Sequence, residues 1–318
     1  MTKKNSFDLM KYSRVLLLVI IVLVMCLLDE RFRTVSNMRT IIEQQVPYMF
    51  LLSSAMTMAI ISGTIDLSLG SVMGLSACVG AYFFYHHDNY VVGILAAFGV
   101  GIAAGLINTL MVVKIGIPPF ITTYGMDWIL KGLAYILTAG KPLYTFRPEF
   151  RVIATGDVFG ISNLFWIMIV VVVLLYLLLN RTTYGRNFYA AGINRNATKI
   201  SGVNTNTIIM VTYVLNGILA TVTGLLYTAR MDVAEASLCE GWNIKLFASV
   251  LIGGTPMTGG KGGILQTLVG VTIMIVITNG LNILGVSSLW QNVATGCVLL
   301  FAIILEVLSD RLNKRLHH

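Results

Sequence analysis

The sequence predicts an all-α, polytopic integral membrane protein that forms one transmembrane domain over residues 1–318. Hydrophobic residues make up 56% of the chain and charged residues only 11%. An ordinary soluble domain carries about 25% charged residues. Apolar runs of roughly 17 to 25 residues, long enough to cross a bilayer, recur along the whole chain. Polar stretches between them are too short for a separate soluble domain.

Ten apolar segments are expected to cross or enter the membrane. They cover about residues 12–28, 46–62, 67–86, 91–113, 117–138, 161–180, 209–229, 243–257, 262–284 and 289–309. The second and eighth are short enough to enter the membrane without a full crossing. The first follows several basic residues, as in a signal peptide, but lacks a small-residue cleavage site, so we expect a retained helix.

The charges divide between the two sides of these segments. With the N-terminus inside, the inner segments hold 13 of the 22 basic residues and the outer segments hold nine of the 14 acidic residues. Because basic residues favour the cytoplasmic side, both termini are expected in the cytoplasm. The net charge of +8 then reflects membrane topology, and no nucleic-acid partner is expected.

Two glycine-rich stretches interrupt the apolar runs. The first is ISGTIDLSLGSVMG, from Ile61 to Gly74, and the second is IGGTPMTGGKGG, from Ile252 to Gly263. In lipid, irregular backbone is tolerated only where protein covers it or where it lines a wet cavity. Asp66 and Ser68 in the first stretch are therefore candidates for a translocation path. The two stretches are also candidates for corresponding positions of an internal repeat, a pattern that points to a transport site.

Asp127 and Lys131 are charged residues inside an apolar run. Counted from Pro118 and Pro119 at the expected helix start, Asp127 lies roughly 14 Å deep. Lys131 is one turn farther along the same face, so the two can pair as i and i+4 neighbours. Charges at such depth face the bundle interior or a wet cavity. The pair is either a structural ion pair or part of a path wall that contacts a hydroxylated ligand.

Several amides add to this modestly polar interior. The further path candidates are Asn108, Asn216, Asn279 and Asn282. Each amide can bond a neighbouring helix as well as a ligand. The interior lacks the chain of acids that a proton relay would need.

Residue patterns for catalysis or cofactor binding are missing from the sequence. Its four cysteines, Cys26, Cys78, Cys239 and Cys297, have neither metal-type spacing nor a disulfide framework. No phosphate-binding loop of the G-x-x-x-x-G-K-[ST] kind is present. We therefore expect no catalytic residue, no metal site and no cofactor on this chain, and any ATP must be bound by a partner subunit.

The longest inner loop, residues 181–207, is basic and has no acidic residue. Apolar positions recur every third or fourth residue and predict a short amphipathic helix. These positions are Tyr184, Phe188, Ala191 and Ile193. Glycines at 185, 192 and 202 divide the loop into short pieces joined by bends. This pattern favours docking into a groove of another protein, with a position flat on the membrane surface as the alternative.

Five motifs now carry a family resemblance. They are GTIDLSLGSVMGL, PPFITTYGMDWILKGLAYILTAGKPLY, TTYGRNFYAAGINRNATKISGV, LIGGTPMTGGKGG and NGLNILGVSSLWQ. In this order they resemble the membrane permease subunit of ribose-type, monosaccharide ABC importers, over about residues 46–306. The resemblance implies a multi-pass protein of the bacterial cytoplasmic membrane. It also implies a second permease subunit (a copy or a paralogue), two ATP-binding subunits, an extracytoplasmic sugar-binding protein and a monosaccharide as cargo.

The resemblance further implies that the inner loop docks on the ATPase. The loop residues concerned are Tyr184, Gly185, Arg186, Ala190, Gly192, Asn194, Ala197 and Gly202. Gly192 is expected to bend the loop where a side chain would collide with the ATPase. The sequence departs from the family pattern in two places. The family's usual Glu-Leu-Asp stretch is replaced by Asn243, Ile244 and Lys245, and Asp127 replaces a usually uncharged residue.

Two other functional classes compete with the permease interpretation. A self-contained secondary sugar transporter or channel would need intramembrane acids and histidines for ion coupling. All four histidines, however, lie at helix ends or at the C-terminus. An intramembrane enzyme would need a nucleophile with its base, or a set of metal ligands, and the sequence offers neither.

Overall fold

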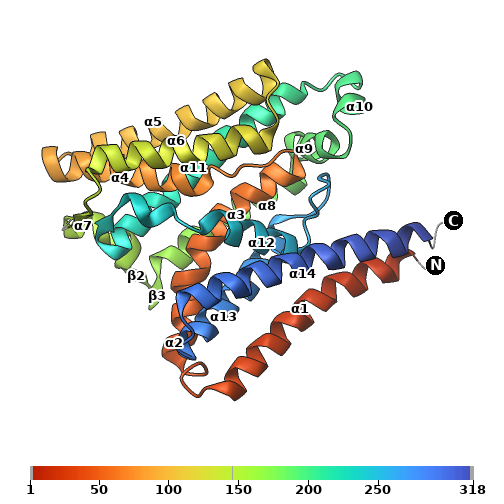
Figure 1. The fold of residues 1–318 in the computed structure, drawn as a ribbon, viewed down its shortest axis with the longest axis horizontal. Coiled ribbons are helices and arrows are strands. Elements are labelled where there is room, and N and C mark those ends of the chain that lie inside the picture. The colour runs from red at the N-terminus through yellow and green to blue at the C-terminus, as the bar shows by residue number, and fades with distance from the viewer. Residues whose placement is uncertain (1–2, 145, 316–318) are drawn as a thin grey trace.

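The computed structural model describes residues 3–144 and 146–315, and each expected apolar run contains a helix (Figure 1). These helices are α1 (Lys3–Leu28), α3 (Val46–Ile61), α4 (Leu69–His87), α5 (Tyr90–Thr109), α6 (Pro119–Thr138), α8 (Asn163–Arg181), α11 (Thr205–Met231), α12 (Trp242–Gly253), α13 (Ile264–Ile283) and α14 (Ser288–Arg315). The first begins nine residues before the expected apolar run, in the basic N-terminal segment. A π-helical turn, η2 (Leu110–Ile115), extends α5.

Within the described residues, four helices are long and apolar enough to cross a membrane. They are Tyr90–Ile115, Asn163–Arg181, Thr205–Met231 and Ile264–Ile283. The chain is therefore a helical membrane protein with several spanning segments. The shorter helices α3 and α12 lie among the longer ones.

Short elements occupy the two ends of the bundle. At one end, on the left in Figure 1, lie α2 (Val35–Arg39), α7 (Pro148–Thr155) and the antiparallel pair β2 (Asp157–Val158) and β3 (Ile161–Ser162). At the other end lie α9 (Thr183–Ile193) and α10 (Arg195–Ile200), together with the start of α1 and the end of α14. The remaining short elements are η1 (Thr40–Gln45), η3 (Ala236–Cys239) and the antiparallel pair β1 (Leu143–Tyr144) and β4 (Val233–Ala234). The predicted inner and outer loops thus separate to opposite ends.

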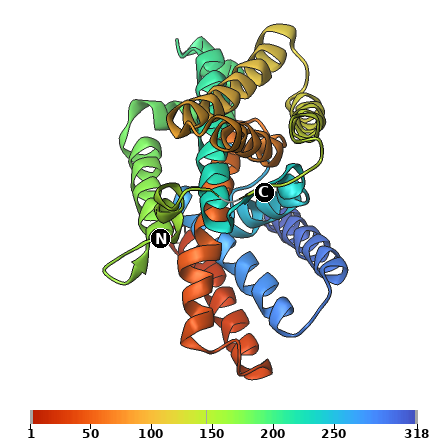
Figure 2. The same cartoon turned by 90° about the vertical axis from the view of Figure 1, so that its left-hand side faces the viewer.

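The short helix α3 lies at the centre of the fold. All sixteen of its residues are buried, because α8, α11, α12 and α13 surround it. A helix that is apolar on every side is stable only when it is covered on every side. In contrast, α6 lies at the edge of the bundle, on the opposite side of α11 from α8, and packs mainly on α4 (Figure 2).

Close backbone contacts hold α5 against α11. A Cβ atom added to Gly217 would lie 2.0 Å from the Gly101 carbonyl oxygen, and one added to Gly105 would lie 2.5 Å from the Tyr213 carbonyl oxygen. Small residues at such spacing let helices approach closely. The spacing of four between Gly101 and Gly105 predicts such close helix packing, and the structure confirms it.

Candidate functional site

Both predicted interruptions are present in the structure. The chain leaves the helix at residues 62–68, between α3 and α4, and again at residues 254–263, between α12 and α13. The two irregular segments meet, because the Gly260 amide donates a 3.0 Å hydrogen bond to the Ile61 carbonyl. Segments about 200 positions apart in sequence therefore form one contact.

Helix α9 packs onto this contact with its own backbone. A Cβ atom added to Gly192 would lie 1.9 Å from the Ile61 carbonyl oxygen and 2.5 Å from the Gly260 nitrogen. The Tyr189 hydroxyl also donates a 3.0 Å hydrogen bond to the Gly262 carbonyl. We call the contact of Ile61, Gly192 and Gly260 the glycine junction. It joins the inner loop to both interrupted segments without an intervening side chain.

The structure confirms short helices in the inner loop but corrects one expectation about them. The buried residues of α9 are Gly185, Phe188 and Ala191, whereas the Tyr184 and Ile193 side chains are 55% and 71% exposed. The apolar face is therefore narrower than the periodicity indicated. The chain's own backbone lies against Gly192, which is a sufficient reason for a glycine there, and clearance from an ATPase stays a prediction.

The loop residues divide between two environments. Those that face outward are Tyr184, Arg186, Asn194, Ala197 and Gly202, whereas Ala190 and Gly192 are half-buried and Gly185 is buried. Asn194 caps α10, because its side-chain oxygen accepts a 3.0 Å hydrogen bond from the Ala197 amide. Capping by asparagine stabilises a helix start.

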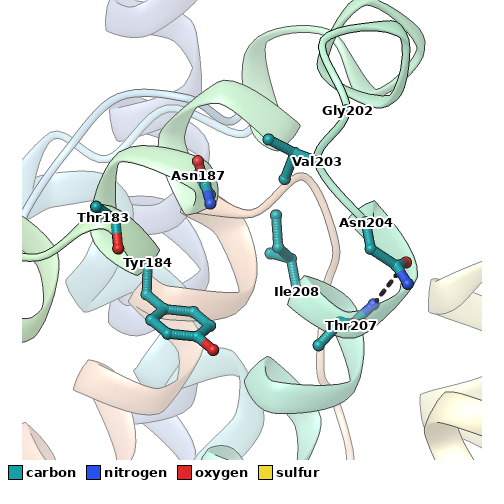
Figure 3. A pocket seen from close by; sticks show the side chains of 8 residues that line it. All are labelled: Thr183, Tyr184, Asn187, Gly202, Val203, Asn204, Thr207 and Ile208. Atoms are coloured by element: carbon teal, nitrogen blue, oxygen red, sulfur yellow. Dashed lines mark hydrogen bonds between the residues drawn. The ribbon is translucent and has the colours of Figure 1, made fainter.

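A pocket of about 390 Å³ lies between α9 and the start of α11 (Figure 3). Its lining has no charged side chain and consists of Thr183, Tyr184, Asn187, Gly202, Val203, Asn204, Thr207 and Ile208. The Asn204 side chain accepts a hydrogen bond from the Thr207 amide at 3.3 Å and so begins α11. The pocket offers amide and hydroxyl groups beside the exposed Tyr184.

Four predicted path residues from three elements form one buried cluster. Asp66 Oδ1 accepts hydrogen bonds from the Ser68 amide (3.0 Å) and hydroxyl (2.6 Å). Its Oδ2 accepts one from Asn216 Nδ2 at 3.0 Å, and Asn108 Nδ2 donates to the Ser68 hydroxyl at 3.0 Å. Each of the four is at most 3% exposed. The cluster therefore holds the first interruption against α5 and α11.

A carboxylate at such a break is expected to accept hydrogen bonds from exposed amides or from a helix N-terminus, and the bonds of Asp66 to the Ser68 backbone amide and the Asn216 side-chain amide confirm this. Ser68 is the N-cap of α4, where a carboxylate interacts favourably with the helix dipole. The Oδ1 atoms of Asn108 and Asn216 are buried and have no hydrogen-bond partner among the described residues. The cluster is enclosed in this conformation and lines no open path.

Asp127 and Lys131 bond to other segments. Lys131 Nζ lies 2.8 Å from Glu240 Oε1, and Asp127 Oδ1 accepts a 3.1 Å hydrogen bond from Asn243 Nδ2. The partner predicted for Lys131 was therefore wrong, because an acid from the segment before α12 takes the place of the i−4 neighbour. The two departures from the family pattern, Asp127 and Asn243, contact each other.

Sequence reasoning missed Asn243 and Glu240 as members of this site. The available signal was the pair of unusual positions at 127 and 243, which is informative only if the two are read together. Gly70 also belongs here, because its amide donates to Asn243 Oδ1 at 3.2 Å.

The remaining amide candidates lie at the opposite end of α13 from the glycine junction. Asn279 Oδ1 accepts from Asn37 Nδ2 at 3.1 Å, and Asn282 Oδ1 accepts from Gln291 Nε2 at 2.7 Å. Both amides bond a neighbouring segment, which is the structural alternative considered for them.

Within the described residues no group of three potential metal ligands occurs. Cys26, Cys78 and Cys297 form no disulfide, and the side chain of Cys239 lies outside the described part of the structure.

Comparison with known proteins gives consistent matches over nearly the whole chain. Residues 39–303 match the family described as branched-chain amino acid transport system / permease component. The ribose import permease protein of Escherichia coli (strain K12) is 33% identical over 302 residues, which cover 94% of each chain. No solved structure matches the chain.

Two further relatives from the same organism are named for other sugars. The D-allose transport system permease protein is 32% identical over 302 residues, which cover 95% of this chain and 93% of the relative. The galactose/methyl galactoside import permease protein is 28% identical over 329 residues, which cover 97% and 98%.

Proposed function

The chain belongs to the family of branched-chain amino acid transport system permease components, and from this premise we propose that it is the membrane permease subunit of an ATP-driven, binding-protein-dependent monosaccharide importer. Relatives named for ribose, D-allose and galactose support a sugar as cargo, although the family description names amino acids. The subunit supplies the translocation path and carries out no chemistry. It is a multi-pass protein of the bacterial cytoplasmic membrane.

The proposal includes the assembly and the topology. Two permease subunits, identical or paralogous, pair with two cytoplasmic ATP-binding subunits and one extracytoplasmic sugar-binding protein. The chain forms one domain over residues 1–318 whose ten apolar helices cross or enter the membrane, with both termini in the cytoplasm. The separation of α9 and α10 from α7 at opposite bundle ends supports this topology. ATP is bound by the partner subunits.

The glycine junction is the observation that carries the coupling part of the proposal. The outward residues of the inner loop, among them Tyr184 and Arg186, contact the ATPase, and the pocket beside Tyr184 receives a partner side chain. The inward residue Gly192 touches Ile61 and Gly260 directly. Because packed backbone is nearly incompressible, a displacement of α9 reaches both interrupted segments at once.

The path residues take two roles in this proposal. Asp66, Ser68, Asn108 and Asn216 hold the first interruption closed, since they are buried and bonded to one another. Asp127 and Lys131 on α6 belong to the path wall. Asn279 and Asn282 fix the far end of α13.

Transport by the reconstituted importer tests the function. The permease is co-purified with its ATPase and binding protein, placed in liposomes, and supplied with radiolabelled D-ribose, D-allose or D-galactose. Uptake that requires both ATP and the binding protein supports the proposal. Uptake driven by an ion gradient without ATP would establish the secondary-transporter alternative, and uptake of leucine but of none of the sugars would overturn the assigned cargo.

A further inference from the structure

Helix α6 has one face against α4 and a second, partly exposed face that carries polar and aromatic side chains. The face against α4 includes the buried residues Met126, Leu130 and Ala134. Beside it, five residues follow the spacing of three and four that places them on one side of a helix. These are Tyr124, Asp127, Trp128, Lys131 and Tyr135, which we call the α6 stripe.

The composition of the stripe distinguishes it from a lipid-facing surface. Counted from the start of α6 at Pro119, Asp127 is expected at membrane depth with Lys131 one turn farther along, and both are only partly buried. Ionisable residues at such positions face the bundle interior or a water-filled cavity. The stripe therefore borders water or a polar ligand during transport.

Asn243 holds Asp127 in a defined orientation. Its side-chain oxygen accepts from the Gly70 amide at 3.2 Å, and its side-chain nitrogen donates to Asp127 Oδ1 at 3.1 Å. An amide meets both requirements at once, because it carries a donor and an acceptor. Asp127 Oδ2 has no hydrogen-bond partner among the described residues, so this oxygen is left to accept a bond from a ligand.

Aromatic surface lies next to this carboxylate. Trp128 is 60% exposed, and its ring forms an edge contact with Tyr124 at 6.5 Å between centroids. Lys131 Nζ lies 5.5 Å from the Trp128 centroid and 2.8 Å from Glu240 Oε1, which also accepts from the Tyr135 hydroxyl at 3.2 Å. The ion pair thus holds one side of the tryptophan in place.

We propose that the α6 stripe is a saccharide-contacting wall of the translocation path, in which Asp127 accepts sugar hydroxyl groups, Trp128 packs against the C–H face of the sugar, and Asn243 is a positioning residue for Asp127. Ligand sites combine apolar and aromatic surface with a few placed polar groups, and a monosaccharide presents both kinds of surface. The inference rests on the proposed function and deepens it by naming the substrate contacts.

Cysteine labelling tests whether the stripe faces water. In a permease whose four native cysteines are replaced by serine, Trp128→Cys is compared with Ile129→Cys, its exposed neighbour outside the stripe (58% exposed). The complete importer in liposomes is treated with a water-soluble, membrane-impermeant thiol reagent. Trp128→Cys is expected to react several-fold faster than Ile129→Cys, and D-ribose with its binding protein should slow the reaction. Equal labelling rates at the two positions would contradict the proposal that the α6 stripe lines the translocation path.

Transport measurements test the roles of Asp127 and Asn243. Asp127→Asn should lower D-ribose uptake per ATP hydrolysed about tenfold, as expected for the loss of one charge-assisted hydrogen bond. Binding-protein-stimulated ATP hydrolysis should stay near the wild-type rate, because the glycine junction is intact. Asn243→Ala should likewise lower D-ribose uptake while ATP hydrolysis stays near the wild-type rate. Asn243→Gln, which keeps the donor and the acceptor, should recover part of the uptake. Ile129→Ala is the matched control and should transport normally.

Two kinds of failure are distinguishable. If the wild-type importer moves no sugar with ATP, the proposed function is wrong. If the wild type moves D-ribose and Asp127→Asn moves it equally well, the permease assignment stands and the saccharide-contacting wall is rejected.

Discussion

Gly192 lies so close to Ile61 that a Cβ atom at position 192 would be 1.9 Å from the Ile61 carbonyl oxygen. The same carbonyl accepts the hydrogen bond of the Gly260 amide. The cytoplasmic docking helix of the proposed importer therefore rests directly on the end of α3 and on the segment between α12 and α13. Coupling between ATPase and path then depends on backbone shape, and small changes at this point should have large effects.

Gly192→Ala should disturb this junction, because backbone on two sides leaves no room for a methyl group. Overpacking of this kind costs about 1 to 3 kcal/mol. We expect a lower melting temperature of the purified permease and reduced stimulation of ATP hydrolysis by the binding protein. The matched control is Gly99→Ala in α5, where an added Cβ meets no atom within 4 Å. Wild-type uptake and stability in Gly192→Ala would show that the glycine junction is not needed for packing or coupling.

Asp66→Ala should destabilise the first interruption. It removes the acceptor for the Ser68 amide and for Asn216 Nδ2, and each buried group left unpaired costs about 1 to 3 kcal/mol. Asp66→Glu, which retains the carboxylate, should keep part of the stability. Thermal unfolding in detergent measures the difference, with the exposed residue Asp157 changed to Ala as control. If Asp66→Ala unfolds at the wild-type temperature, the cluster does not hold the interruption.

A double-mutant cycle should show that Lys131 is coupled more strongly to Glu240 than to Asp127. The Lys131 and Glu240 side chains are 25% and 52% exposed, so the coupling should be about 0.2 to 1 kcal/mol. The first cycle compares Lys131→Met and Glu240→Gln, singly and together, by chemical unfolding. A second cycle compares Lys131→Met and Asp127→Asn in the same way. A larger coupling energy in the second cycle would show that Lys131 pairs with Asp127, its i−4 neighbour, and not with Glu240.

The same ion pair predicts a small effect of pH. The Lys131 ammonium lowers the pKa of the Glu240 carboxyl below its ordinary value, mainly through their hydrogen bond. A group whose pKa is depressed by folding stabilises the protein above its unfolded pKa and loses this contribution as the pH falls through the folded value. When the pH is lowered from about 6 to about 3, the melting temperature of the wild type should therefore fall by more than the melting temperature of Lys131→Met. Parallel curves of melting temperature against pH for the two proteins would show that the Lys131–Glu240 pair does not contribute to stability.

Topology is tested by labelling from one side of the membrane. Single cysteines at Asn194, in the α9–α10 loop, and at Asp157, in β2, lie at opposite ends of the bundle. An impermeant thiol reagent should label position 194 only from the cytoplasm and position 157 only from outside. The reverse pattern would overturn the orientation inferred from charge.

The sequence alone determined the membrane class, the ten helical segments and the two interruptions. These features follow from local properties: apolar length sets which segments can enter lipid, and glycine content marks where helices such as α3 and α12 end. The sequence also predicted that the Asp66 carboxylate would accept hydrogen bonds from exposed amides or from a helix N-terminus, because the glycine-rich break frees backbone groups from helix bonding.

Only the tertiary structure decided which distant residues meet. Lys131 has Asp127 one turn away, yet its ion pair is with Glu240, more than a hundred residues farther along the chain. The sequence predicts Gly192 only as a bend in the inner docking loop, whereas in the fold it contacts Ile61 and Gly260. Local spacing fixes the neighbours within one helix, whereas contacts between helices depend on how complete surfaces pack, and no short segment of sequence contains that information.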